Sequence, residues 1–127
     1  MSEDILNACL ASLDRWMAAL NAYDAKAMDA EMHFPHVRLA GGKLVVYEQA
    51  GSNPMDLFDR LRREDDWHHS VWNERKAVQV YPTKVHWAVN YTRYRSDGSV
   101  IGHYDSLYVM VLKDGRWGTQ VRSSFGP

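Results

Sequence analysis

Apolar side chains near the start of the chain recur at intervals of three and four residues. This spacing places them on one face of an amphipathic helix. The face consists of Ile5, Cys9, Leu13, Trp16, Met17 and Leu20. Glu3 and Asp4 lie at the start of the pattern, where negative side chains favour the helix dipole. The pattern breaks over residues 21–24, and a second, short helix is predicted from about Asp24, its N-cap, to Glu31.

A short hairpin is predicted next. Pro35 ends any helical segment, because it lacks a backbone N–H and restricts the residue before it. Gly41-Gly42 then separates residues 36–40 from residues 43–47, so these two segments form the strands of the hairpin.

A third helix and four long strands complete the pattern. The helix opens at Ser52-Asn53-Pro54, where proline is tolerated in the first turn, and ends near Asp65. Residues 69–125 form four strands joined by tight turns at 81–84, 96–99 and 113–116. Asp-Gly in the last two turns is the strongest short-range signal of a hairpin. The order of elements predicts an α+β fold in a single domain covering residues 1–127.

Two-residue turns determine which side chains of neighbouring strands share a face. The expected pairs are Trp87–Tyr108, Val89–Ser106, Tyr91–Tyr104, Tyr108–Val121, Val78–Trp87 and Glu74–Tyr91. The face predicted to pack beneath the helices comprises Trp72, Val78, Val80, Trp87, Val89, Tyr91, Tyr104, Tyr108, Met110, Trp117, Val121 and Phe125. The opposite face includes Arg75, Asn90, Asp105, Leu107, Val109, Val111, Arg122 and Ser124. A β-bulge in any long strand would move the residues that follow it from one face to the other.

Charge and cysteine content narrow the class of protein. Lys and Arg number 15 against 16 acidic residues, and this net charge of -1 argues against an electrostatically driven nucleic-acid binder. The single cysteine, Cys9, excludes an intramolecular disulfide and lies on the apolar helix face as a small hydrophobe. No apolar run approaches the ~18 residues of a membrane span, and no apolar signal segment follows the acidic N-terminus. We therefore expect a cytoplasmic protein.

Three parts of the chain resemble the nuclear transport factor 2-like superfamily, which includes SnoaL-like cyclases, ketosteroid isomerase and scytalone dehydratase. They are residues 33–38 with the Gly41-Gly42 turn, residues 97–108, and residues 114–117 with 122–125. The likeness extends over essentially the whole chain and is greatest to a group of bacterial proteins without an established activity. It implies a cone-shaped fold: a strongly curved, mainly antiparallel sheet, three helices on its concave face, a pocket between them, and a homodimer through the convex face.

The resemblance also indicates a kind of chemistry. Enzymes of the superfamily mostly work without a metal or organic cofactor, so none is expected here, and they place an acid–base residue inside an apolar cavity. His33 and His36 lie in the segment that often supplies a carboxylate base. They are candidates for a general acid–base pair, since imidazole titrates near neutral pH. The alternative is structural: one ring bonds the backbone at the proline turn while the other is partly exposed.

Further candidate residues lie on the two faces of the sheet. The predicted ligand pocket comprises Trp72, Glu74, Tyr91, Arg93, Tyr104 and Tyr108. Its tyrosine hydroxyls are donors for a carbonyl or an oxyanion, or else they are satisfied locally within a plain core. The predicted dimer face comprises Arg75, Asn90, Asp105, Leu107, Val109, Arg122 and Ser124. No metal site is predicted, because the adjacent His68 and His69 should point to opposite sides of a strand.

Two functions are consistent with these features. The first is a cofactor-independent lyase or isomerase acting on a small, largely apolar or aromatic molecule. His36 or His33 would be its acid–base group, and Tyr91 or Tyr108 its hydrogen-bond donor. The second is a non-catalytic ligand-binding or dimeric interaction module. Neither nucleic acid nor a membrane is an expected partner, and the sequence does not identify a substrate.

Overall fold

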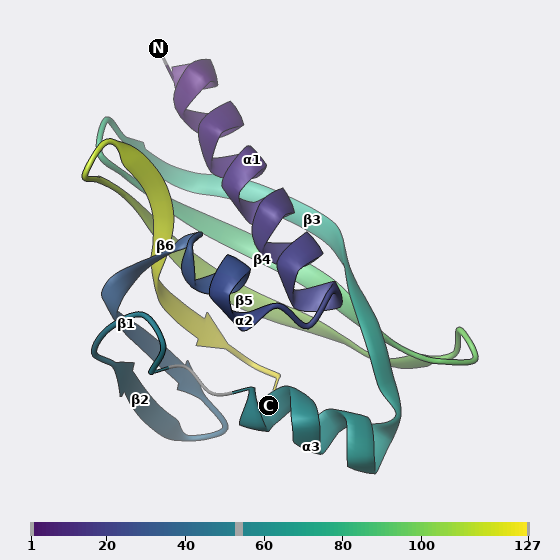
Figure 1. Cartoon of the computed structure of the whole chain (residues 1–127). Helices are drawn as coiled ribbons and strands as arrows, with labels where there is room; N and C mark the ends of the chain where they lie inside the picture. The colour runs from purple at the N-terminus through teal and green to yellow at the C-terminus, as the bar shows by residue number, and fades with distance from the viewer. Residues whose placement is uncertain (1, 53–54, 127) are drawn as a thin grey trace.

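The computed structural model describes residues 2–52 and 55–126. Within these ranges, three helices and six strands follow one another in the predicted order (Figure 1). The helices are α1 (Ser2–Asn21), α2 (Ala25–Asp29) and α3 (Asp56–Asp65). The strands are β1 (Met32–Ala40), β2 (Lys43–Tyr47), β3 (Trp67–Tyr81), β4 (Lys84–Arg95), β5 (Val100–Lys113) and β6 (Arg116–Ser124).

The helices lie close to their predicted positions. The Asp24 carboxylate accepts a hydrogen bond from the backbone N–H of Ala27 at 3.1 Å and so caps α2 as expected. After α3, Asp66 adopts a left-handed conformation with φ 55°. The prediction that Asn53-Pro54 open α3 falls outside the described residues. Among the residues described, no helix is both long and apolar enough to cross a membrane.

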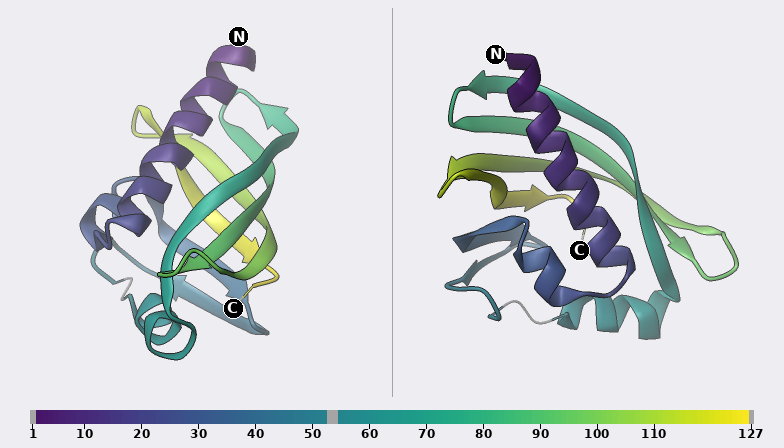
Figure 2. Two further views of the ribbon diagram at one scale, coloured as in Figure 1. Left: turned by 90° about the vertical axis from the view of Figure 1, so that its right-hand side faces the viewer. Right: turned by 45° about the horizontal axis from the view of Figure 1, so that its top comes forward.

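The strands form one sheet in the order β2-β1-β6-β5-β4-β3. All neighbouring strands in it are antiparallel except β1 and β6, which run parallel. The sheet curls strongly, and α1 crosses its concave side (Figure 2). Its edge strands, β2 and β3, do not pair with each other, so the curled sheet does not close into a complete cone. The predicted α+β class and the curved, mainly antiparallel sheet are confirmed.

Strand β1 departs from the prediction at its start. The hairpin was expected to begin at His36, but β1 begins at Met32 and passes through Pro35. The ladder between β1 and β6 is irregular between Met32 and Val37. Pro35 lies in this irregular segment, where its missing N–H does not interrupt regular pairing.

The register between β4 and β5 is confirmed. Its predicted pairs Trp87–Tyr108, Val89–Ser106 and Tyr91–Tyr104 are all present. The connection is the predicted segment 96–99, because β4 ends at Arg95 and β5 begins at Val100, but it is longer than the two-residue loop on which the register was based. A register shift beside Arg93 compensates for this longer connection, so the pairing beyond it is the one that a two-residue turn predicts.

Bulges in the other ladders reverse part of the predicted face assignment. In β3 a bulge pairs Glu74 with Asn90, whereas the prediction paired Glu74 with Tyr91. In β6 a bulge pairs Tyr108 with Arg122, whereas the prediction paired Tyr108 with Val121. One extra residue moves every following side chain to the other face until the next irregularity.

Several predicted positions are therefore wrong. The residues that move to the concave face are Arg75, Arg122 and Ser124, and those that move to the convex face are Glu74 and Val121. Val78 lies in a second bulge of β3, where Ala77 takes its expected place opposite Trp87. Phe125, expected beneath the helices, is 87% exposed.

The concave face and the apolar face of α1 form the core. Around the first half of α1 the buried core residues are Cys9, Leu13, Val85, Trp87, Val89, Tyr108 and Met110. Around its second half they include Trp16, Met17, Leu20, Met28, Phe58, Leu61, Trp67 and Tyr91. The helix pattern in the sequence thus predicted the residues of α1 that pack on the sheet.

Candidate functional site

A cavity lies on the concave side of the sheet, where the second half of α1 meets α3. We call it the inner cavity, and its volume, measured as the space open to a water-sized sphere, is about 20 Å³. Its apolar wall consists of Trp16, Met17, Leu20, Leu57 and Phe58. Its polar wall consists of Arg38, Ser70, Tyr91, Arg93, Tyr108, Arg122 and Ser124. The space is narrow, so it suits a small polar group better than a whole ring.

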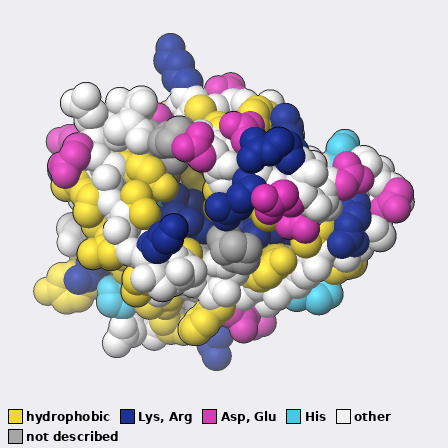
Figure 3. Space-filling model, turned by 90° about the horizontal axis from the view of Figure 1, so that it is seen from below, with side chains coloured by type: hydrophobic (Ala, Val, Ile, Leu, Met, Phe, Trp, Pro, Cys, Tyr) yellow, Lys and Arg dark blue, Asp and Glu magenta, His cyan; other side chains and the backbone are white. Residues whose placement is uncertain are grey.

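A wider space adjoins the inner cavity between the β1–β2 hairpin and α3, and we call it the outer chamber. By the same measure its volume is about 350 Å³. The residues that line both spaces are Arg38, Leu57, Phe58 and Arg122. Seen from below, this end of the molecule is hollowed, with Lys and Arg side chains around the hollow (Figure 3).

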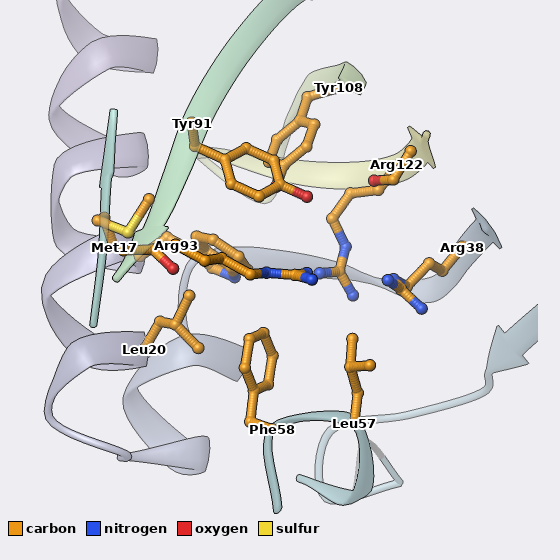
Figure 4. A pocket seen from close by; sticks show the side chains of 12 residues that line it. Met17, Leu20, Arg38, Leu57, Phe58, Tyr91, Arg93, Tyr108 and Arg122 are labelled. Carbon is orange, nitrogen blue, oxygen red and sulfur yellow. The ribbon is translucent and has the colours of Figure 1, made fainter. Parts of the chain in front are cut away.

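Three arginines reach the inner cavity from three different strands: Arg38 from β1, Arg93 from β4 and Arg122 from β6. Figure 4 shows their guanidinium groups extending toward the same space. The guanidinium carbon of Arg93 lies 4.7 Å from the centroid of the Tyr104 ring and 5.6 Å from that of Tyr91, distances typical of cation–π contacts. The polar wall is thus strongly cationic.

Tyr91 and Tyr108 bring two hydroxyl groups to the same wall. Burial raises the pKa of Tyr108 above its ordinary value, and the neighbouring Tyr91 adds to the rise. The Tyr108 hydroxyl therefore stays protonated at neutral pH and can donate a hydrogen bond. Within the described part of the chain, neither hydroxyl makes a hydrogen bond to another residue, so both are available to a ligand.

His36 lies beside Arg122 with both ring nitrogens engaged. Arg122 Nε–H donates to His36 Nε2 at 2.8 Å, so Nε2 carries no proton. Nδ1 donates to the carbonyl oxygen of Thr119 at 3.0 Å. Burial, and then the charge of Arg122, lower the pKa of His36 to about 3, so the ring is neutral at neutral pH. With both nitrogens engaged, the ring orients Arg122 and has no nitrogen left to exchange a proton with a ligand.

His33 also bonds the backbone. Its Nε2 donates to the carbonyl oxygen of Arg116 at 3.0 Å, and burial lowers its pKa. His33 lines neither the inner cavity nor the outer chamber. It therefore supplies no acid–base group to either space. The structural alternative holds in part: both rings bond the backbone, but neither is partly exposed, because His33 and His36 are both buried.

The predicted pocket residues divide into three groups. Those that line the inner cavity are Tyr91, Arg93 and Tyr108. Trp72 and Tyr104 lie behind them: the Trp72 ring centroid is 5.7 Å from that of Tyr108, and the Tyr104 centroid is 5.7 Å from that of Tyr91. Glu74 does not belong to the pocket, because the bulge in β3 turns it to the convex face.

The predicted dimer face is also divided. Asn90, Asp105, Leu107 and Val109 lie on the convex face, where Asn90 Nδ2 donates to Asp105 Oδ1 at 2.9 Å. Arg75 instead forms an ion pair with Asp14 of α1 on the concave side. Arg122 and Ser124 line the inner cavity, so they cannot contribute to the convex face.

From the sequence, Arg93 was assigned to the pocket and Arg122 to the dimer face, but Arg38 was given no role. Arg38 shares a strand face with His36, and the apolar residues Val37 and Leu39 alternate with them. This alternation of polar and apolar positions beside the Gly41-Gly42 turn was the available signal. No comparable signal existed for Arg122, because its face depends on a bulge.

The described part of the chain contains no group of three His, Cys, Asp or Glu side chains that could hold a metal ion. His68 and His69 do not point to opposite sides as expected. Their Nδ1 atoms lie 2.9 Å apart, at a point where the ladder between β3 and β4 shifts register after Trp67.

No family model matches the sequence, and no curated protein matches it. Among solved structures, the chain is similar to an NTF2-like protein of unknown function from Shewanella oneidensis, with a TM-score of 0.74, 10% identity, and coverage of 94% of this chain and 98% of that one. It is similar to a protein of unknown function with a cystatin-like fold from Nostoc punctiforme, with a TM-score of 0.78, 11% identity, and coverage of 98% and 92%.

A structure from Catenulispora acidiphila in complex with S-DNPA is also similar, with a TM-score of 0.75, 14% identity, and coverage of 97% of this chain and 93% of that one. At such identities the likeness concerns the fold alone. The architecture, the sheet order and these neighbours agree with the resemblance seen in the sequence. The chain therefore has the nuclear transport factor 2-like fold.

Proposed function

We propose that this chain binds a small organic molecule that passes through the outer chamber into the inner cavity. The observation that carries the proposal is that Arg38, Leu57, Phe58 and Arg122 line both spaces. A narrow polar end behind a wider entrance suits an amphipathic ligand, with its polar group innermost and its apolar body in the outer chamber, between α3 and the β1–β2 hairpin. The S-DNPA complex of the Catenulispora acidiphila protein supports a ligand site in a protein of this fold.

A cofactor-independent lyase or isomerase is the second candidate. The hydroxyls of Tyr91 and Tyr108, beside guanidinium groups, form a donor set that can stabilise an oxyanion. Such an enzyme also needs a base within hydrogen-bond reach of its substrate, and His36 has no ring nitrogen to spare. Of the described residues that line the two spaces, Asp56 at the outer chamber is the one with a carboxylate. We therefore place binding ahead of catalysis.

Blocking the junction between the two spaces tests the proposal. Leu57→Trp adds bulk where they meet, and Leu44→Trp, on the exposed surface of β2, is the matched control. Thermal-shift assays and calorimetry would use acetophenone, cinnamyl alcohol and cinnamate. At least one compound should stabilise wild type and Leu44→Trp but not Leu57→Trp. Equal stabilisation of all three proteins, or of none, would contradict the proposal.

The same mixtures separate binding from catalysis. Nuclear magnetic resonance spectra recorded over time would reveal conversion of any compound that binds. Conversion by wild type that is lost in Asp56→Asn would favour the second candidate. Binding without conversion in either protein would favour the first.

We also propose that two copies associate through the convex face, as the resemblance implies. Leu107 is 40% exposed and Val71 is 42% exposed on this face, which favours a covered surface. Light scattering should give twice the chain mass of 14.6 kDa. Leu107→Lys should reduce this mass to that of a monomer, whereas Leu44→Lys should not. A monomeric wild type would refute the association.

A further inference from the structure

Two guanidinium groups lie side by side at the junction of the two spaces. Arg38 of β1 and Arg122 of β6 are register partners in the parallel ladder, so their side chains emerge next to each other on the concave face. Figure 4 shows both directed toward the same space. Like charges in such positions repel each other. Burial, and then the charge of Arg122, accordingly lower the pKa of Arg38.

Hydrogen bonds to buried groups hold Arg122 in place. Its Nε–H donates to His36 Nε2 at 2.8 Å, and His36 Nδ1 donates to the Thr119 carbonyl oxygen at 3.0 Å. His36 is completely buried and neutral, so it orients the guanidinium without compensating its charge. The bond to Nε leaves both Nη groups of Arg122 for the cavity, in a pre-organised position.

Arg38 has more hydrogen-bond donors available to a ligand than Arg122 has. Among the described residues, it makes no side-chain hydrogen bond and no ion pair. None of the described residues that line the inner cavity is an Asp or a Glu, and Asp56 lies in the outer chamber beyond it. A partly buried cation pair without a facing carboxylate is unfavourable by itself, because desolvation and repulsion act together. An anionic ligand would relieve both.

We infer that the ligand is a small organic carboxylate, an inference that rests on the proposed small-molecule function. The carboxylate oxygens would accept hydrogen bonds from Arg38 and the Nη groups of Arg122, the geometry that guanidinium groups favour. The hydroxyls of Tyr91 and Tyr108 would donate from the same wall. The apolar or aromatic body would extend along Leu57 and Phe58 into the outer chamber. A planar carboxylate fits the narrow inner end better than a tetrahedral phosphate.

Matched pairs of acid and amide test the inference. Calorimetry at constant pH and ionic strength would compare cinnamate with cinnamamide and phenylacetate with phenylacetamide, with inorganic phosphate as an anion that lacks an apolar body. The members of each pair have nearly the same shape and differ in charge. Each acid should bind at least about tenfold more tightly than its amide, and more tightly than phosphate.

Substitutions then assign the difference to particular residues. Arg38→Gln and Arg122→Gln should each weaken binding of the acid about tenfold and change binding of the amide less than about twofold. Arg38→Lys should cause a smaller loss, because it keeps the charge without the fork of donors. Arg75→Gln is the matched control: Arg75 also lies on the concave side but pairs with Asp14 outside both spaces. Melting curves establish that each variant is folded.

The outcomes distinguish this inference from the proposed function. If acid and amide bind equally and Leu57→Trp excludes both, the small-molecule function stands and the carboxylate assignment is overturned. If phosphate binds as tightly as the organic acids, recognition of an organic body is overturned. If no compound binds at all, the proposed function and this inference both fall.

Discussion

The two halves of α1 cover the same face of the sheet, but the side chains beneath them differ in character. Beneath the first half, Val85 and Met110 of the sheet are completely buried among other apolar residues, and so is Leu13 of the helix, which packs with them. Beneath the second half, the cavity wall contains Tyr91, Arg93 and Arg122. The change can be followed along the single strand β4. Its side chains on the concave face are valine and tryptophan at one end, then tyrosine, and finally arginine.

This difference separates the part of the core that stabilises the fold from the part that suits a ligand. Close-packed apolar side chains in the interior stabilise the fold without needing a ligand or a charged partner. Buried cations reduce stability unless an opposite charge meets them. Arg38 and Arg122 line the interior of the protein, where apolar side chains would stabilise the fold more. Departures of this kind from an apolar interior concentrate at functional sites. The following three changes test this comparison.

The largest effect is expected from Leu13→Ala in the apolar half. Leu13 has no exposed surface, so the change removes buried methyl groups and leaves a cavity. Urea denaturation should show a loss of about 2–5 kcal/mol in the free energy of unfolding. Leu44→Ala, at a position 67% exposed, should change it by less than about 0.5 kcal/mol. Similar losses for the two variants would contradict this picture of the core.

A smaller effect is expected from acidification, acting through His36. The folded-state pKa of His36, about 3, lies below the ordinary value of about 6.5, so the unfolded chain takes up this proton first as pH falls. The associated stability is complete above about pH 6.5 and decreases by up to about 1.4 kcal/mol for each pH unit below it. His33, whose pKa is also lowered, acts in the same direction.

The variant His36→Gln separates this contribution from the others. Glutamine can donate to the Thr119 carbonyl and accept from Arg122 without titrating. Between pH 7 and 5, its free energy of unfolding should fall about 2 kcal/mol less than that of wild type. His68→Gln, at an exposed position, should follow wild type. An unchanged pH dependence in His36→Gln would show that His36 is not buried and neutral.

The smallest effect is expected from Arg38→Met in the cationic half. Methionine has a similar length and no charge, so the change removes repulsion from Arg122 and the cost of burying a cation. The free energy of unfolding should rise by about 1 kcal/mol in the absence of ligand. Arg75→Met, which breaks the ion pair with Asp14, should not stabilise the protein. Destabilisation by Arg38→Met would mean that Arg38 supports the fold instead of a ligand.

Short-range patterns predicted most of the secondary structure. The apolar positions of α1, the cap at Asp24 and the Asp114-Gly115 turn each depend on neighbours within a few residues. Asp114 and Gly115 both have positive φ, of 54° and 76°, as that type of hairpin turn requires. The site was predicted only in part: Tyr91, Arg93 and Tyr108 follow from the confirmed register of β4 and β5.

The remaining site residues could not be predicted in this way. Arg122 reaches the cavity because a bulge falls between Val109 and Met110 in its ladder, and nothing in the local sequence indicates that position. The same reason explains why Glu74 was assigned to the pocket and Arg75 to the convex face. His36 is of a residue type common in catalysis, but the two groups that occupy its ring nitrogens, on Thr119 and Arg122, are distant in the sequence and could not be predicted from its neighbours.

The sequence by itself determined the α+β class, the order of the elements and the apolar face of α1, because periodicity and turn chemistry act over a few residues. Only the tertiary structure decided which arginines enter the cavity and that His36 is a neutral acceptor for Arg122, a residue 86 positions away. The physical reason is that side chains alternate along a strand with a period of two, so one extra residue reverses the faces. Where that residue is accommodated depends on packing across the whole sheet.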